Sequence, residues 1–122
     1  MKYIVYYLTK VFMFFVKVLA KPPIGAKLFK EINAAYSVGV GSEAFQEKRY
    51  DDAYKTLKPI ADYKISDVYV GSAQYIVGVM YYHGLGIEKN YDVAVNYLKN
   101  AKENNNDDAD RLLNKILSSN DE

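Results

Sequence analysis

Several residue types are missing or rare in this chain of 122 residues. It contains no cysteine, no tryptophan and only one histidine. The lack of cysteine excludes disulfides, thiolate metal sites and cysteine nucleophiles, and it is typical of a reducing compartment. We therefore expect a cytoplasmic protein rather than a periplasmic one. The rest of the sequence, which shows no ligand or cofactor motif, predicts no cofactor and no metal.

Long apolar runs are also missing, although half of the residues are apolar. Lys10 and Lys17 interrupt the apolar start of the chain, so no uninterrupted run exceeds six residues, whereas a membrane-spanning helix needs about 20.

Acidic residues are absent from residues 1–30, which hold six lysines, while the rest of the chain holds ten basic and fifteen acidic side chains. The basic start suits an anionic surface, and the acidic remainder argues against nucleic acid as a partner.

The apolar start predicts an amphipathic helix with a broad apolar face. At about 100° per residue, one stripe holds the lysines together with a threonine and a methionine; its members are Lys2, Thr9, Lys10, Met13, Lys17 and Lys21. The remaining circumference is filled by Ile4, Tyr7, Leu8, Val11, Phe12, Phe14, Phe15, Val18 and Leu19. Three interpretations stay open: a helix packed on the rest of the chain or in a homodimer, a helix in the plane of a membrane through residues 1–21, and a secretion signal. An in-plane helix would associate the protein with the inner membrane. The candidate membrane or dimer contacts are Lys10, Phe14, Phe15 and Lys17.

A break at Pro22-Pro23-Ile24-Gly25 is expected to end this helix, because a residue before proline is disfavoured in the helical region. We expect residues 1–25 to form the N-terminal helix and a hinge, 26–118 a helical domain, and 119–122 a frayed tail. Turn and capping residues predict helices over residues 26–48, 51–63, 68–83, 90–103 and 107–118. In the last of these, the apolar residues expected to face inward are Ala109, Leu112, Leu113, Ile116 and Leu117.

Two strings recur along the chain. Glu47-Lys48-Arg49-Tyr50-Asp51-Asp52-Ala53 is echoed by Glu88-Lys89-Asn90-Tyr91-Asp92-Val93-Ala94, 41 residues later. Upstream of each lies a second shared string, Tyr36–Val40 and Tyr75–Val79, 39 residues apart. A period near 40 residues indicates a repeat architecture built from stacked helical hairpins.

From Ala73 onward the chain resembles the Sel-one-like repeat, a variant of the tetratricopeptide fold with a longer, glycine-containing turn. The matching residues are Ala73, Gly78, Tyr81, Gly84, Gly86, Ile87, Asp92, Ala94, Tyr97, Lys99 and Ala101. The earlier unit, residues 34–61, lacks the Gly-x-Gly turn and is closer to an ordinary tetratricopeptide hairpin. The resemblance covers about residues 34–117 and implies an all-α fold: a short α-solenoid of about two and a half hairpins, preceded by the amphipathic helix.

The resemblance also implies binding of another protein without catalysis. Small proteins of this kind include bacterial immunity proteins, so a cognate toxin or effector is the expected partner. The alternative is a membrane-associated adaptor. Candidate contacts on the repeat surface are Tyr54, Tyr63, Tyr69, Tyr82, His83 and Leu85.

No catalytic or metal-binding pattern emerges from the sequence. His83 stands at a predicted helix end, where an imidazole serves best as a capping group, and no orienting partner accompanies it. Asp107, Asp108 and Asp110 lack the glycine and glutamate of a calcium loop and suit a helix start instead.

Overall fold

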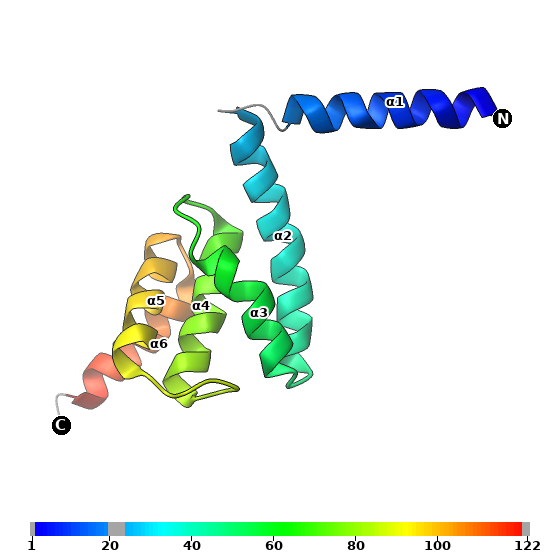
Figure 1. Cartoon of the computed structure of the whole chain (residues 1–122). Coiled ribbons are helices and arrows are strands. Elements are labelled where there is room, and N and C mark those ends of the chain that lie inside the picture. The colour runs from blue at the N-terminus through cyan, green and yellow to red at the C-terminus, as the bar shows by residue number, and fades with distance from the viewer. Residues whose placement is uncertain (1, 20–23, 121–122) are drawn as a thin grey trace. The chain divides into compact units, whose positions relative to one another are not determined.

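The computed structural model describes residues 2–19 and 24–120. These residues form six α-helices and no strand, which confirms the all-α prediction. The helices are α1 (Lys2–Leu19), α2 (Ile24–Gln46), α3 (Tyr50–Ala61), α4 (Val68–His83), α5 (Tyr91–Glu103) and α6 (Asp107–Asn120) (Figure 1). The chain divides inside α2 into two compact units, Met1–Asn33 and Ala34–Glu122, called here the N-terminal and C-terminal units.

Local capping fixes the start of three helices in the C-terminal unit. The Asp67 carboxylate accepts hydrogen bonds from the backbone N–H groups of Tyr69 and Val70, at 2.8 and 3.2 Å, and so caps α4. Asn90 accepts from Val93 N at 3.1 Å before α5, and Asn106 accepts from Ala109 N at 2.9 Å before α6. Each bond satisfies a backbone donor that a helix start leaves unpaired.

Several predicted helix boundaries need correction. Helix α3 begins at Tyr50, with Asp51 in its first turn, and it ends at Ala61 instead of residue 63 because Tyr63 N bonds back to Ile60 O in a tightened turn. Helix α2 begins at Ile24, inside the predicted hinge, instead of at residue 26, and it ends at Gln46 instead of at residue 48. Helix α6 continues to Asn120, beyond the predicted end at residue 118. Of the predicted hinge, Pro22 and Pro23 lie outside the described residues, as do residues 121–122 of the predicted tail.

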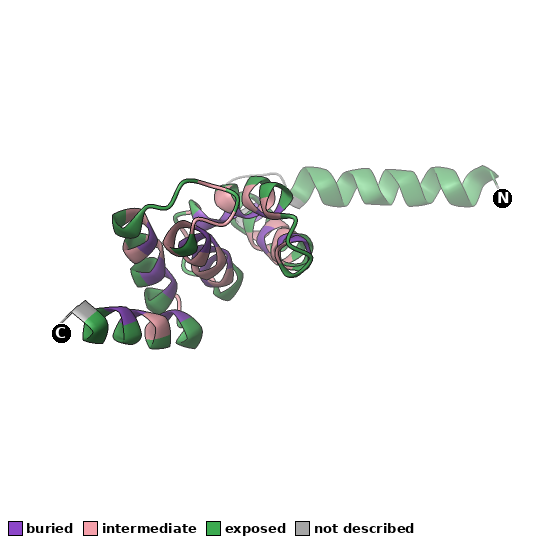
Figure 2. Ribbon diagram, turned by 90° about the horizontal axis from the view of Figure 1, so that it is seen from below, coloured by how far each residue is buried: buried purple, intermediate pink, exposed green. Residues whose placement is uncertain are grey.

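The core of the C-terminal unit lies between successive helices, where α3 packs on α4, α4 on α5, and α5 on α6. Figure 2 shows the buried residues gathered on the facing sides of these helices. Leu57, Val77 and Leu98 are fully buried at the first two contacts. On α6, Ala109, Leu113 and Ile116 are buried as predicted, but Leu117 is 53% exposed. Its position at the edge of the apolar stripe explains the difference, since it lies about 80° around the helix from Ala109.

The Gly84–Asn90 loop returns the chain from α4 to α5. Gly84 and Gly86 both have positive φ, 68° and 71°, which side-chain-bearing residues adopt at a cost. Leu85 N donates to Met80 O at 2.9 Å and Asn90 N donates to Tyr81 O at 3.0 Å. A Cβ placed on Gly86 would lie only 2.6 Å from Tyr50 Cβ, so this loop rests directly on the start of α3.

Gly39 and Gly41 of α2 differ in their surroundings, and alanine is expected to have opposite effects at the two. A Cβ at Gly39 meets nothing within 4 Å, so Gly39→Ala should raise the free energy of unfolding by about 0.5–1 kcal/mol through helix propensity. A Cβ at Gly41 would lie 2.4 Å from Leu57 Cγ, so Gly41→Ala should lower it by about 1–2 kcal/mol through overpacking. Urea unfolding measures both, and equal stability of the two variants would contradict the close packing at Gly41.

Candidate functional site: a polar groove along α5

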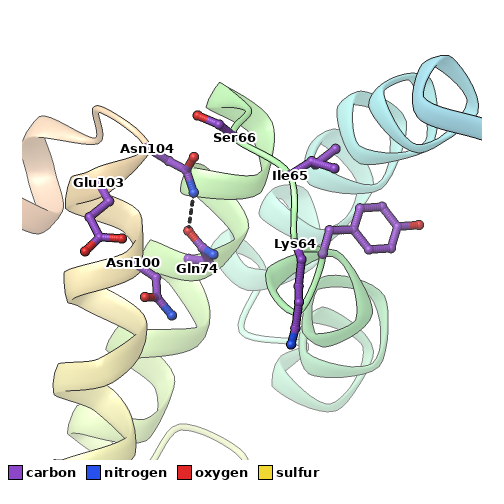
Figure 3. A pocket seen from close by; sticks show the side chains of 8 residues that line it. Lys64, Ile65, Ser66, Gln74, Asn100, Glu103 and Asn104 are labelled. Carbon is purple, nitrogen blue, oxygen red and sulfur yellow. Dashed lines mark hydrogen bonds between the residues drawn. The ribbon is translucent and has the colours of Figure 1, made fainter. Parts of the chain in front are cut away.

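A groove runs along α5 on the C-terminal unit. It consists of two adjoining hollows of about 400 and 430 Å³ that share Tyr63, Lys64, Gln74 and Asn100. Helix α5 forms one wall, the loop between α3 and α4 forms the other, and α4 contributes Gln74 between them. In Figure 3, Lys64 on the loop and Asn100 on α5 lie on opposite sides of Gln74. The lining is rich in amides and tyrosines.

The floor of the groove is a hydrogen-bonded amide network. Gln74 is only 5% exposed, and its Nε2 donates to Ala61 O at 3.2 Å while its Oε1 accepts from Asn104 Nδ2 at 2.8 Å. Asn104 Oδ1 accepts in turn from Asp67 N at 3.1 Å. Buried amides are costly to leave unpaired, so this network ties the loop to the end of α5.

A glycine lets the two helices meet closely at this point. A Cβ on Gly71 of α4 would lie 2.8 Å from Asn104 Cβ and 3.2 Å from Asn104 O. A larger residue at position 71 would push α5 away from α4. Glycine at this position therefore keeps Asn104 within hydrogen-bonding distance of the loop.

Three tyrosines from α3, α4 and α5 join beside the groove. The Tyr81 and Tyr97 rings stack with centroids 5.9 Å apart and planes 5° from parallel, and the hydroxyls of Tyr54 and Tyr81 are hydrogen-bonded at 2.8 Å. Tyr97 Oη donates to Asp62 Oδ1 at 2.7 Å, and Asp62 also pairs with Lys58. The cluster therefore connects three helices through side chains.

The charges of this cluster are fixed at neutral pH. Burial, with a further contribution from the Tyr54 hydroxyl, raises the pKa of Tyr81 to about 12. The hydrogen bond to Asp62 raises the pKa of the Lys58 ammonium above its ordinary value. Tyr81 thus stays neutral and Lys58 stays charged, which suits packing and hydrogen bonding.

The exposed face of α5 carries Asn96 and Asn100, one turn apart. Both line the groove and both are exposed, and within the described part of the chain neither side chain has a hydrogen-bond partner. Lys64 on the loop and Glu103 on α5 are exposed charges in the same groove. These residues offer donors, acceptors and opposite charges to a bound molecule.

The structure places the predicted surface contacts in separate locations. Of the six, Tyr63 alone lines the groove. Tyr54 is half-buried in the tyrosine cluster, and Tyr69 is 47% exposed in the first turn of α4. Sequence reasoning missed Asn96 and Asn100; their four-residue spacing, continued by Asn104, was the available signal.

The other three predicted contacts, Tyr82, His83 and Leu85, lie at or just after the C-terminal end of α4, away from the groove. The rings of Tyr82 and His83 meet edge to face, with centroids 4.8 Å apart, and Lys89 Nζ lies 6.0 Å from the Tyr82 ring centroid. His83 is the exposed last residue of α4, followed by the left-handed Gly84. Leu85 is half-buried against the cluster of Ala44, Ala53 and Met80.

The predicted contacts of the N-terminal unit all belong to α1. Phe14 and Phe15 are exposed, as are Lys10 and Lys17, and Lys10 Nζ lies 5.4 Å from the Tyr6 ring centroid. Among the helices that the structure describes, none has the length and apolar character to cross a membrane.

Residues 2–19 and 24–120 contain no group of three His, Asp or Glu side chains that could hold a metal ion.

No protein family, curated protein or solved structure matches the chain.

Proposed function

We propose that the C-terminal unit is a non-enzymatic protein-interaction module. The observation that carries the proposal is the groove, in which exposed asparagines, tyrosines and charges of both signs line a surface formed by two helices and a loop. Protein contacts rely on such mixtures of aromatic and hydrogen-bonding groups. The rigid network beneath the groove supports the same role, since a preorganised surface loses little entropy on binding.

The unit is proposed to be a short solenoid of the tetratricopeptide or Sel-one-like type. Supporting this, the two copies of the recurring string occupy equivalent places: Tyr50 is the first residue of α3 and Tyr91 the first of α5. Gly78 packs closely against Leu98, since a Cβ placed on this glycine would lie 3.0 Å from Leu98 Cδ2, and the small residues of stacked hairpins allow such close packing. The narrower proposal, an immunity protein that neutralises a toxin or effector, rests on the sequence resemblance.

Purification of the tagged full-length chain from its native cells tests the proposed function. We expect one protein to co-purify in stoichiometric amount and to form the same complex when both are purified and mixed. Co-expression should reduce the toxicity of that partner if the narrower proposal holds. The absence of any stoichiometric partner, in lysates with and without reversible cross-linking, would contradict the module.

The second candidate is a membrane-associated adaptor, favoured by the arrangement of α1. Its lysine stripe faces away from a broad apolar surface, and its described side chains from Lys2 to Val18 are exposed. A helix of this kind lies in the interface with its lysines at the headgroups. The two candidates are compatible, because one concerns the C-terminal unit and the other α1.

A further inference from the structure

The side chains left without partners in the groove follow a regular spacing. Asn96 and Asn100 are four residues apart on α5, which separates them by about 6 Å along the helix. In an extended peptide, residues two apart are separated by about 6.8 Å. If an extended strand lies along α5, Asn96 can therefore face one of its residues and Asn100 the residue two positions away.

The chemistry of the asparagine side chain matches a peptide backbone. Its amide presents an acceptor and a donor side by side, which complement the N–H and C=O of a single residue. The backbone of an extended segment needs such partners, because it makes no internal hydrogen bonds. Asn104 stands at the next position of the series, but it is engaged with Gln74 and Asp67.

The shape of the groove fits a segment rather than a compact ligand. The lining residues of α5 and its C-cap run from Val93 to Asn104, a length of about 16 Å, which corresponds to about five extended residues. The loop wall carries Lys64 and also Asp62, whose charge is paired with Lys58, while the helix wall carries Glu103. These charges favour an acidic side chain on the loop side of the segment and a basic one on the helix side.

We propose that this groove binds an extended segment of a partner protein, about five residues long, through backbone hydrogen bonds to Asn96 and Asn100. The inference rests on the proposed function and specifies the form in which the partner is bound. A helical partner would present side chains instead of its backbone, so the two forms of binding are distinguishable by experiment.

A phage-displayed library of random dodecapeptides, selected on the full-length chain, tests the inference. Selected peptides are synthesised, and their dissociation constants are measured by fluorescence anisotropy. The variant Asn96→Ala/Asn100→Ala should bind them at least about tenfold more weakly. Asn114→Ala, an exposed asparagine of α6, should bind them as the wild type does. Thermal unfolding establishes that both variants are folded.

Backbone N-methylation of a selected peptide gives a second readout. N-methylation of residues that face Asn96 or Asn100 should weaken binding at least about tenfold, and N-methylation of the residues between them should have little effect. The sensitive positions should therefore alternate along the peptide. The inference is overturned if no peptide is selected, or if the double variant binds the peptides as tightly as the wild type does. It is also overturned if N-methylation weakens binding at every third or fourth residue, the spacing of a helix. If the co-purified natural partner binds the double variant as tightly as the wild type, the inference fails while the proposed function stands.

Discussion

Replacing Gly86 with alanine is expected to lower the free energy of unfolding by about 3 kcal/mol. Two costs combine at this position. A side-chain-bearing residue at φ 71° costs about 1–2 kcal/mol, and the new methyl group would lie 2.6 Å from Tyr50 Cβ and 3.4 Å from the Tyr50 backbone carbon. Tyr50 cannot move aside cheaply, because those atoms are fixed by the start of α3, and overpacking of this kind costs about 1–3 kcal/mol. Urea unfolding followed by circular dichroism measures the loss.

Gly84→Ala is the matched control for Gly86→Ala. Gly84 has nearly the same φ, 68°, but a Cβ there would lie 3.3 Å from its nearest neighbour, Lys89 Cβ. Gly84→Ala should therefore lower the free energy of unfolding by about 1–2 kcal/mol, from the backbone conformation alone. Equal losses for the two variants would show that the α4–α5 loop does not rest on the start of α3.

Reversing the charge of Lys10 and Lys17 is expected to weaken binding of the full-length chain to anionic vesicles by about two orders of magnitude. Each lysine near an anionic surface contributes about 1 kcal/mol, and Lys→Glu replaces attraction with repulsion. Flotation with vesicles of phosphatidylglycerol and phosphatidylcholine measures the effect. Vesicles of phosphatidylcholine alone should bind the wild type weakly, through the apolar face only.

Lys99→Glu/Lys115→Glu is the control for this charge reversal, because it changes the net charge equally at two exposed lysines of the C-terminal unit. It should leave vesicle binding within about twofold of the wild type. If the intact chain fails to float with anionic vesicles, the adaptor candidate is wrong. Sedimentation equilibrium then tests the homodimer, whose formation would bury the same apolar face.

The helix order was predictable because its signals are local. Asp67 and Asn90 cap their helices through backbone groups within three residues, and Gly84 ends α4 in a conformation that glycine adopts freely. The start of α3 was less predictable, since Arg49 precedes it without a side-chain cap. Gly39 and Gly41 look alike in the sequence, and the packing of Leu57 alone distinguishes them.

The groove could not be predicted, because it depends on residues far apart in the chain. Its floor joins Gln74 to Asn104, 30 residues away, and Asn104 to Asp67, 37 residues away. Surface tyrosines were the expected contacts, yet Tyr54 is engaged in a hydrogen bond with Tyr81. A sequence pattern shows which residues are polar, whereas the tertiary contacts decide which of them remain available for binding.

Site-specific photo-crosslinking to the co-purified partner tests the central claim most directly, namely that the C-terminal unit binds a protein along α5. Benzoylphenylalanine is placed at position 100 in the groove, or at position 114 on α6 as the control. We expect irradiation to link the partner to the chain from position 100 and not from position 114. Cross-linking from position 114 with none from position 100 would contradict the account.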